Sequence, residues 1–361
     1  MHLTLFVPDL LWPEVDDAAA FDFPGAAELA RFLFLSEANR SATDLTASWE
    51  SRLAVLFGFP EQHAPLAALR TRGNGLTANG QQLCTDPVNL DFMQQALVLS
   101  PIAGDTLSNT ETDALLQTLN EEFAGEGRFF ATPQRTDACQ WTFISEAADA
   151  SLPDLAACSR LAGRRVDADE TRQLLGRDGL RWINRIQMCL NQHPVNQGRE
   201  AQGLPAINSL WPWGLGELTA APPNRFATAH GRAALLTGLC QVTGTPQTTA
   251  AAWPQTAGQH LVTELRLTDA ICHSDLSLWQ SAISEVATHW VSPALAALAD
   301  RHSPLQSLTL ISPNAHYEHR WTLKRSSKGV RPNRLPRLLQ RCLGLTPEAP
   351  TLHALVRSWS A

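Results

Sequence analysis

The chain has 361 residues, of which 44% are hydrophobic and 17% charged, and its formal net charge is −7. This composition can bury a core, so it excludes wholesale disorder, and the length fits two domains. No apolar run approaches the ~18 residues of a membrane helix, so no membrane association is expected. Seven cysteines without a CxxC pair favour reduced thiols and a cytoplasmic location.

The charge is distributed unevenly along the chain. Residues 301–345 carry nine basic side chains and one acidic one, which leaves a balance of −15 on the rest. The basic segment 320–341 predicts either a solvated face that pairs with the acidic body or a docking surface for an acidic protein partner. It lacks interleaved aromatic residues and any known nucleic-acid-binding module, so a nucleic-acid partner is not expected.

Hydrophobic periodicity and breaker residues predict the elements in chain order. The first half gives a strand at 2–7, helices at 26–35 and 48–57, a turn at Asp86-Pro87 and a strand at 96–99. Ser108 and Glu111 form a capping box that begins a helix reaching Phe123. Strands at 128–131 and 140–144 follow, then a helix at 178–191 that ends before Pro194.

After Ala206 short apolar strands again alternate with helices. This part gives strands at 207–213, 261–267 and 308–311, helices at 233–242 and 276–298, and a hairpin partner at 320–323. Such alternation predicts an α/β fold with a mostly parallel sheet and helices on both faces. Residues 106–205 are predicted to form an inserted, smaller α+β lobe, so that 1–105 and 206–361 make the core.

The densest polar run is NQHPVNQGREAQGLPAINSLWPWGLG, residues 191–216. It is predicted to end a helix, form a strand and enter a glycine-bounded loop, and open α/β sheets bind ligands at such strand ends. Arg199 could clamp a carboxylate or phosphate, with His193, Asn196 and Asn208 lining the same pocket. Alternatively, these polar groups cap the helix end and tie the two lobes together.

This run resembles the archaeal-type cofactor-independent phosphoglycerate mutases of the alkaline phosphatase superfamily. It is more similar still to shorter bacterial relatives described as regulatory proteins of the RpfE type. The residues that carry the resemblance are HPVN at 193–196, Arg199, Gly203, Pro205, Asn208 and WPWGLG at 211–216, with support from 235–246 and 269–298. The resemblance implies an alkaline-phosphatase-like sheet with an inserted lobe.

Those mutases move a phosphoryl group through a serine at a site with two divalent metals, so the resemblance implies manganese, zinc or magnesium. It places Asp9, Asp269 and His273 at ligand positions. Where the family has an adjacent Asp-His pair, this chain reads Ser-Pro-Asn at 312–314, and His316 or His319 would have to substitute. No serine before Arg70 stands in a family-like context. Without the resemblance, Asp9 is a turn or cap residue and Asp269-x3-His273 a pair on one helical face.

Three functional hypotheses remain. The first is a phosphoglycerate-mutase-related pseudoenzyme with an incomplete two-metal site, which binds a small phosphorylated or carboxylated ligand in a regulatory role. The second is an active metal-dependent phosphoglycerate mutase or phosphotransferase with a rearranged site. The third is an interaction module that docks an acidic protein partner.

Overall fold

The structure is a computed structural model that describes residues 1–12, 17–43, 47–62, 64–93, 96–131, 139–146, 152–250, 252–325 and 350–360. The chain divides into two compact units. The first unit comprises Met1–Asp44, Arg225–Gly231 and Thr245–Ala361, and the second comprises Leu45–Asn224 and Arg232–Gly244. Within the described parts of the chain, no helix is both long enough and apolar enough to cross a membrane.

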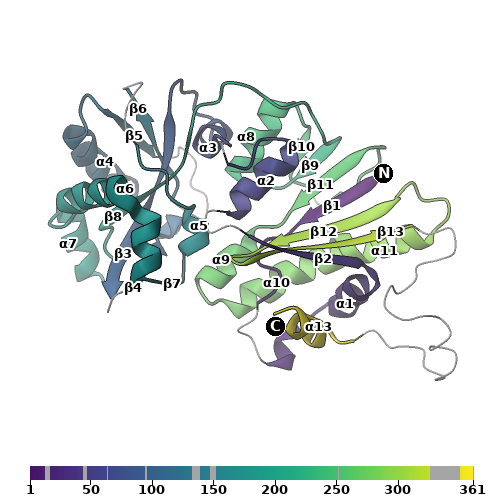
Figure 1. Ribbon diagram of the computed structural model, residues 1–361. Helices are drawn as coiled ribbons and strands as arrows, with labels where there is room; N and C mark the ends of the chain where they lie inside the picture. The colour runs from purple at the N-terminus through teal and green to yellow at the C-terminus, as the bar shows by residue number, and fades with distance from the viewer. Residues whose placement is uncertain are drawn as a thin grey trace. The chain divides into compact units, whose positions relative to one another are not determined.

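The first unit is built on a seven-stranded, mostly parallel sheet in the order β10-β9-β11-β1-β12-β13-β2 (Figure 1). Its strands are β1 (His2–Phe6), β2 (Glu37–Ala42), β9 (Thr228–His230), β10 (Gln247–Thr248), β11 (Gln259–Thr263), β12 (Ser307–Pro313) and β13 (Tyr317–Lys324). Strand β1 pairs in parallel with β11 and β12, one on each side. Its residues Leu3, Leu5 and Phe6 are at most 1% exposed, as expected for a strand covered on both faces.

Helices pack against this sheet around one hydrophobic core. They are η1 (Ala18–Phe21), α1 (Ala26–Leu35), α9 (Arg266–Cys272), α10 (Leu276–Val286), α11 (Ser292–Ala299) and α13 (Leu352–Ser360). A π-helical turn, η3 (Ala287–Val291), joins α10 to α11. Pro293 lacks the N–H that would continue an α-helix, and the N–H of Ser292 instead bonds the carbonyl of Ala287, five residues back.

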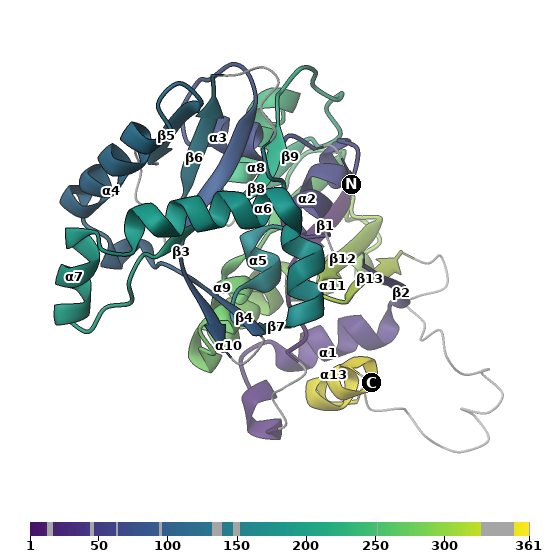
Figure 2. The same cartoon turned by 60° about the vertical axis from the view of Figure 1, so that its left-hand side comes forward.

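The second unit is built on an antiparallel sheet in the order β5-β6-β3-β4-β7, with β8 also paired to β3. Its strands are β3 (Gln82–Met93), β4 (Ala96–Pro101), β5 (Gly127–Ala131), β6 (Trp141–Ser145), β7 (Arg165–Asp167) and β8 (Ser209–Gly216). Its helices are α2 (Trp49–Phe57), α3 (Leu66–Gly73), η2 (Gly104–Thr106), α4 (Asn109–Glu122), α5 (Cys158–Leu161), α6 (Ala168–Leu190), α7 (Pro194–Ala201) and α8 (Ala234–Thr243). Helix α6 crosses the strands of this sheet (Figure 2).

The predicted mixed α/β fold, with a mostly parallel sheet and a separate lobe, is confirmed. The predicted boundaries of the lobe, 106–205, differ from those of the second unit. Strands β3 and β8 both lie outside the predicted limits, yet they pair with each other in the antiparallel sheet. Residues 213–216, predicted as a loop, are the second half of β8 because their backbone stays in that pairing.

The turn predicted at Asp86-Pro87 is wrong, because β3 runs straight through both residues. Proline has no N–H to donate, so it is disfavoured in a strand that has a hydrogen-bonded neighbour on each side. At Pro87 this costs little, because the pairing of β3 with β6 ends at Cys84 and its pairing with β4 begins at Val88. The carbonyl of Pro87 still accepts a hydrogen bond from the N–H of Ile102.

Candidate functional site

The polar run at 191–216 lies in the second unit and begins at the start of α7. His193 is the N-cap residue of this helix, and its Nδ1 accepts a hydrogen bond from the N–H of Val195 at 3.2 Å. Its Nε2 lies 3.1 Å from the hydroxyl of Thr118 on α4. The imidazole therefore links the start of α7 to α4.

Asn196 is 4% exposed and holds together the two chain segments on either side of α7. Its Nδ2 donates to the carbonyls of Leu190 and Ile207, each at 2.9 Å. Its Oδ1 accepts from the N–H of Ile207 at 2.8 Å. All these contacts are with backbone groups, which would otherwise be buried without partners.

We therefore expect Asn196→Ala to lower the free energy of unfolding by about 2–3 kcal/mol, because it leaves buried backbone groups without partners. Urea denaturation followed by circular dichroism measures this change. Gln197→Ala on the exposed side of the same helix is the matched control, with an expected change within about 0.5 kcal/mol. A loss below about 1 kcal/mol for Asn196→Ala would contradict the role of Asn196 in holding together the chain segments before and after α7.

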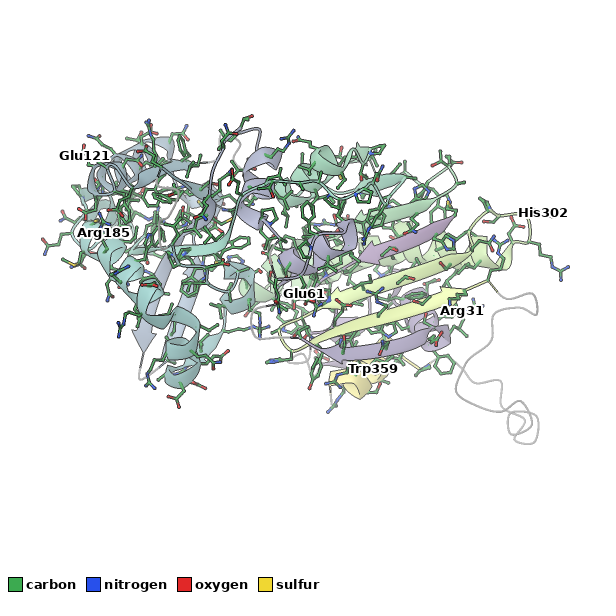
Figure 3. All side chains as sticks on the ribbon, turned by 45° about the horizontal axis from the view of Figure 1, so that its top comes forward. Arg31, Glu61, Glu121, Arg185, His302 and Trp359 are labelled. Atoms are coloured by element: carbon green, nitrogen blue, oxygen red, sulfur yellow. The ribbon has the colours of Figure 1, made fainter. Side chains whose placement is uncertain are left out.

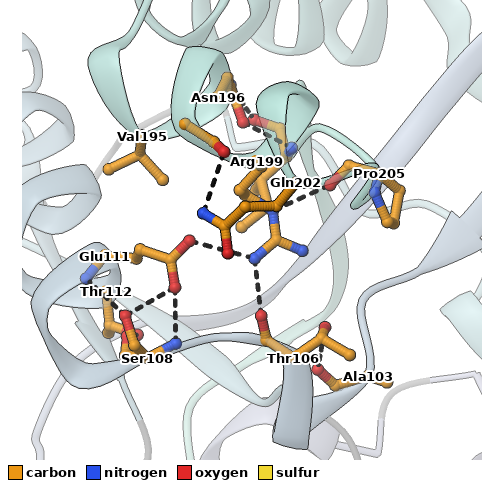
Figure 4. A network of polar contacts seen from close by, with 12 residues as sticks. Ala103, Thr106, Ser108, Glu111, Thr112, Val195, Asn196, Arg199, Gln202 and Pro205 are labelled. Carbon is orange, nitrogen blue, oxygen red and sulfur yellow. Dashed lines mark hydrogen bonds and ion pairs between the residues drawn. The ribbon is translucent and has the colours of Figure 1, made fainter.

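Arg199 has no exposed side-chain surface and lies among carbonyl groups (Figure 4). Its Nε donates to the carbonyl of Pro205 at 2.9 Å, and its Nη1 donates to the carbonyl of Thr106 at 2.7 Å and to Glu111 Oε1 at 3.3 Å. Partial burial raises the pKa of Glu111, but hydrogen bonds from Ser108 and Arg199 outweigh this and hold the pKa below its usual value. Among the described residues, Nη2 of Arg199 has no hydrogen-bond partner.

Asn208 completes the predicted group, and its contacts are again with backbone. Its Oδ1 accepts from the N–H of Leu90 at 2.8 Å, and its Nδ2 donates to the carbonyl of the same residue at 3.1 Å. The amide thus extends the pairing of the chain before β8 with β3. The contacts described for the four residues of this group all lie within the second unit, where they cap α7 and bind backbone groups. A role in tying the two lobes together and a ligand role both stay predictions.

A buried ion pair that the sequence did not predict lies next to Trp213, near the end of the polar run. Trp213 Nε1 donates to Asp86 Oδ2 at 2.8 Å, and the same oxygen accepts from Arg70 Nη1 at 2.8 Å. Arg70 Nη2 donates to the carbonyl of Trp141 at 2.7 Å, and Asp86 Oδ1 accepts from the N–H of that residue. Four elements, α3, β3, β6 and β8, therefore meet at one pair of charges.

The glycines of the run have a packing role. A Cβ on Gly216 would lie 2.8 Å from the Cα of Pro65, just before α3, and one on Gly214 would lie 3.0 Å from the Cβ of Leu66. Gly214 also has a φ of +69°, in the left-handed region that favours glycine. The WPWGLG pattern therefore allows close contact between β8 and the start of α3.

A second titratable group missed by the sequence analysis is Glu50, in the first turn of α2. It is 4% exposed, and its Oε2 accepts a hydrogen bond from the hydroxyl of Ser159 at 2.8 Å. Burial raises the pKa of this carboxyl to about 7, although the hydrogen bond from Ser159 and the charge of Arg70 act in the opposite direction. The polar patterning of ASWES at 47–51 gave no sign of this, because Glu50 looks like an ordinary acidic residue in a first turn.

In the first unit, Asp9 follows β1 at the carboxyl end of the parallel strands. It is half-buried with a φ of +55°, and its N–H bonds the carbonyl of Pro313 at the end of β12. The hydroxyl of Ser312 accepts from the N–H of Leu10 at 3.1 Å. These contacts join the ends of two neighbouring strands at the edge where open α/β sheets bind ligands.

The turn after β12 occupies the position at which the resemblance implies an Asp-His pair. Pro313 is still in the antiparallel ladder, opposite Glu318. The Oδ1 of Asn314 accepts from the N–H groups of His316 and Tyr317, each at 2.8 Å. Asn314 is thus a turn residue, which is a common role of asparagine.

The other predicted metal ligands lie on exposed surfaces or in the core. Asp269 and His273 are exposed at the two ends of one turn of α9, and the Nδ1 of His273 contacts the carbonyl of Asp269 at 2.9 Å. His316 is exposed in the hairpin turn. Across the described ranges, no three His, Cys, Asp or Glu side chains converge on a possible metal site, so Asp9, Asp269, His273 and His316 are not brought together.

His319, the other substitute, belongs to an aromatic stack. It is 3% exposed, and its ring is stacked with those of Trp321 on β13 and Trp359 on α13. Figure 3 labels Trp359 on this helix. The two tryptophan rings are themselves 4.6 Å apart. Burial, assisted by the charge of Arg40, lowers the pKa of His319 to about 4. The imidazole is therefore a neutral part of the contact between α13 and the sheet.

The basic segment 320–341 lies mostly outside the described residues. Of its described members, Arg320 pairs with Glu318 at 3.3 Å, and Arg325 Nη2 donates to the carbonyl of Ala297 in the last turn of α11 at 2.8 Å. One of these charges thus pairs with the single acidic residue of 301–345, and the other binds a backbone carbonyl. Docking of an acidic partner at this segment stays a prediction.

No known family matches the chain by sequence, and a search of curated proteins finds no match. Among solved structures, the chain is similar to the PH0037 protein from Pyrococcus horikoshii, with 12% identity, 92% of this chain and 88% of that chain covered, and a TM-score of 0.49. It is also similar to a cofactor-independent phosphoglycerate mutase from Thermoplasma acidophilum, with 13% identity, coverage of 92% and 91%, and a TM-score of 0.40. Identities and TM-scores at this level assign neither a family nor an activity.

Proposed function

We propose that the chain is a phosphoglycerate-mutase-related protein that binds a small phosphorylated or carboxylated ligand in a regulatory role, on a scaffold with an incomplete two-metal site. The signature at 191–216 supports the relationship, in the form found in bacterial RpfE-type proteins. The observation that carries the proposal is the turn after β12. There Pro313 remains in the ladder and the Oδ1 of Asn314 is committed to two backbone N–H groups.

The remaining donors do not fit a two-metal centre. Two cations about 3.5–4 Å apart need several carboxylates and imidazoles converging on one place. Among the described residues no three such side chains converge, and Asp269 and His273 are exposed on α9. We therefore derive no phosphoryl transfer through metals, and the proposed role is binding. The six described cysteines are free, which fits the cytoplasmic location that we propose.

Metal loading tests this proposal against an active mutase. After incubation with Mn²⁺ or Zn²⁺ and desalting, we expect well under one equivalent of metal, unchanged in Asp9→Asn and Asp269→Asn. We expect no conversion of 3-phosphoglycerate to 2-phosphoglycerate. Near two equivalents, lost in both variants together with mutase activity, would overturn the proposal in favour of a metal-dependent enzyme.

Calorimetric titration with 3-phosphoglycerate, with and without EDTA, tests the binding role. Binding that EDTA leaves unchanged is the expected result, because the proposed site needs no cation. Binding that disappears with EDTA would instead show that a metal bridges the ligand to the protein. Arg199→Ala tests the predicted ligand role of this buried side chain, provided that circular dichroism shows the variant to be folded. Loss of a charged hydrogen bond to the ligand would weaken binding by about 1.5–3 kcal/mol, and unchanged affinity would contradict the role.

A further inference from the structure

Residues 154–161 of the second unit lie beside β8, the strand within the 191–216 signature (hereafter the signature strand). At the end of this segment, α5 contacts α2 through Ser159. The N–H of Leu155 donates to the carbonyl of Pro212 at 3.3 Å, and Trp211 Nε1 donates to the carbonyl of Ala156 at 2.8 Å. At the far end, the hydroxyl of Ser159 on α5 donates to Glu50 Oε2 on α2 at 2.8 Å. Asp154, at the start of the segment, also contacts β8, because its Oδ1 accepts a hydrogen bond from the N–H of Leu215 at 3.0 Å, and burial raises the pKa of this carboxyl. The segment is thus held to β8 by two neutral hydrogen bonds and a carboxylate, and to α2 by the carboxyl of Glu50.

Glu50 has little compensation for a negative charge. In the parts of the chain that the structure describes, no arginine or lysine forms an ion pair with it. Arg70 of α3 is the charged group that faces it, and that guanidinium is already bound to Asp86. Arg160 follows the hydrogen-bond donor on α5, and α8, which also packs on α2, carries no charged residue. Burial of Glu50 outweighs the hydrogen bonds from Ser159, from Ser48 and from its own N–H, and the charge of Arg70, so an ionised Glu50 is a buried charge that is only partly compensated.

We propose that Glu50 makes the 154–161 segment a proton-controlled clasp, closed on α2 while Glu50 is neutral and loosened when Glu50 ionises. Removing a carboxylate from water without a counter-ion is unfavourable, whereas a protonated carboxyl with one hydrogen bond is readily buried. Opening of the segment lets water reach Glu50 and removes this penalty. It also breaks the hydrogen bond from Trp211, so the state of Glu50 is communicated to the signature strand.

The direction of the pH dependence follows from proton linkage. In the closed state the pKa of Glu50 is about 7, and in an opened, solvated state it returns to near 4.5. Opening therefore releases a proton between these two values. The opening equilibrium rises about tenfold per pH unit from pH ~4.5 to pH ~7 and is level above that. Acid closes the clasp, and neutral solution loosens it.

Hydrogen–deuterium exchange of the full chain tests the clasp. After correction for intrinsic exchange rates, the protection of peptides covering 154–161 should fall about 40-fold from pH ~5 to pH ~7 and only about twofold more to pH ~8. Glu50→Gln should remove most of this change, since only Asp154 then remains as a buried carboxyl in the segment, and Glu121→Gln on the exposed face of α4 should behave as the wild type. Flat wild-type protection, or an unchanged slope in Glu50→Gln, would overturn the proposal.

Ser159→Ala provides a second test that does not depend on how Glu50→Gln folds. This variant removes the hydroxyl donor that favours the charged form of Glu50. The pH at which protection becomes level should therefore move above ~7. If the protection profile of Ser159→Ala is the same as that of the wild type, Glu50 is not the group that controls the segment. Neither measurement involves the ligand, so failure of the clasp leaves the proposed binding role standing.

Discussion

Asp86→Ala is expected to lower the free energy of unfolding by about 3–5 kcal/mol, because it leaves the buried guanidinium of Arg70 without its counter-ion. The side chains of this pair are 6% and 11% exposed, so water can replace the carboxylate only poorly. The same substitution removes the acceptor for Trp213 Nε1 and for the N–H of Trp141. Urea denaturation at neutral pH, monitored by circular dichroism, measures the loss.

Two further variants separate the contributions to this loss. Asp86→Asn keeps the size and one carbonyl oxygen but removes the charge, so it should show only part of the loss. Arg172→Ala breaks an ion pair with Asp169 whose side chains are 72% and 91% exposed, and should change stability by less than about 0.5 kcal/mol. A loss below about 1 kcal/mol for Asp86→Ala would contradict a structural role for the buried pair.

Local sequence signals predicted individual elements well. The capping box of Ser108 and Glu111 begins α4, and the apolar spacing at 26–35 matches α1. Both signals depend on residues within one turn of each other, so no distant contact can override them. The turn predicted at Asp86-Pro87 failed for the opposite reason. Whether a strand tolerates proline depends on whether a neighbouring strand pairs with it at that position. Here the pairing with β6 ends before Pro87 and the pairing with β4 begins after it, which only the fold shows.

The division into units was beyond the reach of local patterns. Residues 45–105 precede the predicted lobe, yet β3 joins β8 across more than a hundred residues of chain. Alternation of strands and helices predicts a mostly parallel sheet, but it does not show which of the strands belong to a second sheet. Strand β8 has the apolar texture of a buried parallel strand because all of its first five residues, 209–213, are buried, although its pairing is antiparallel.

The candidate site shows the same limit. The sequence marked Asn196, Arg199 and Asn208 as polar candidates for ligand binding, and in the structure they bind backbone groups of Ile207, Thr106 and Leu90. A side chain that binds a carbonyl of its own chain and one that binds a ligand need the same donors. Only the fold distinguishes these two cases, so a dense run of polar residues can reflect contacts that hold the fold together as well as a ligand-binding pocket.

Glu50 and the pair of Arg70 and Asp86 are buried ionisable groups, and neither stood out in the sequence. Charged residues in amphipathic helices and strands are ordinarily solvated, and burial arises only when α2, α3, α5 and β8 come together. Once buried, the two groups differ in kind. Asp86 is bound by a cation and by two further N–H donors, whereas Glu50 is bound by neutral donors such as the hydroxyl of Ser159 and takes up a proton instead.

Glu50→Gln should accordingly stabilise the protein at neutral pH. Because the pKa of Glu50 is raised to about 7 in the folded protein, its favourable contribution is complete below the unfolded pKa and is lost as the pH rises through 7. Glutamine is neutral at every pH, so the variant and the wild type should be equally stable near pH ~4.5. The variant should then gain an advantage that reaches about 3 kcal/mol above pH ~7.

Denaturant titrations of the wild type and Glu50→Gln across this pH range measure the difference directly, and other titrating groups cancel between the two proteins. Glu121→Gln, on the exposed face of α4, should show no pH-dependent difference from the wild type. A difference for Glu50→Gln that does not vary with pH would mean that Glu50 is charged throughout. Its burial would then need a counter-ion that α3 does not supply, because Arg70 already binds Asp86.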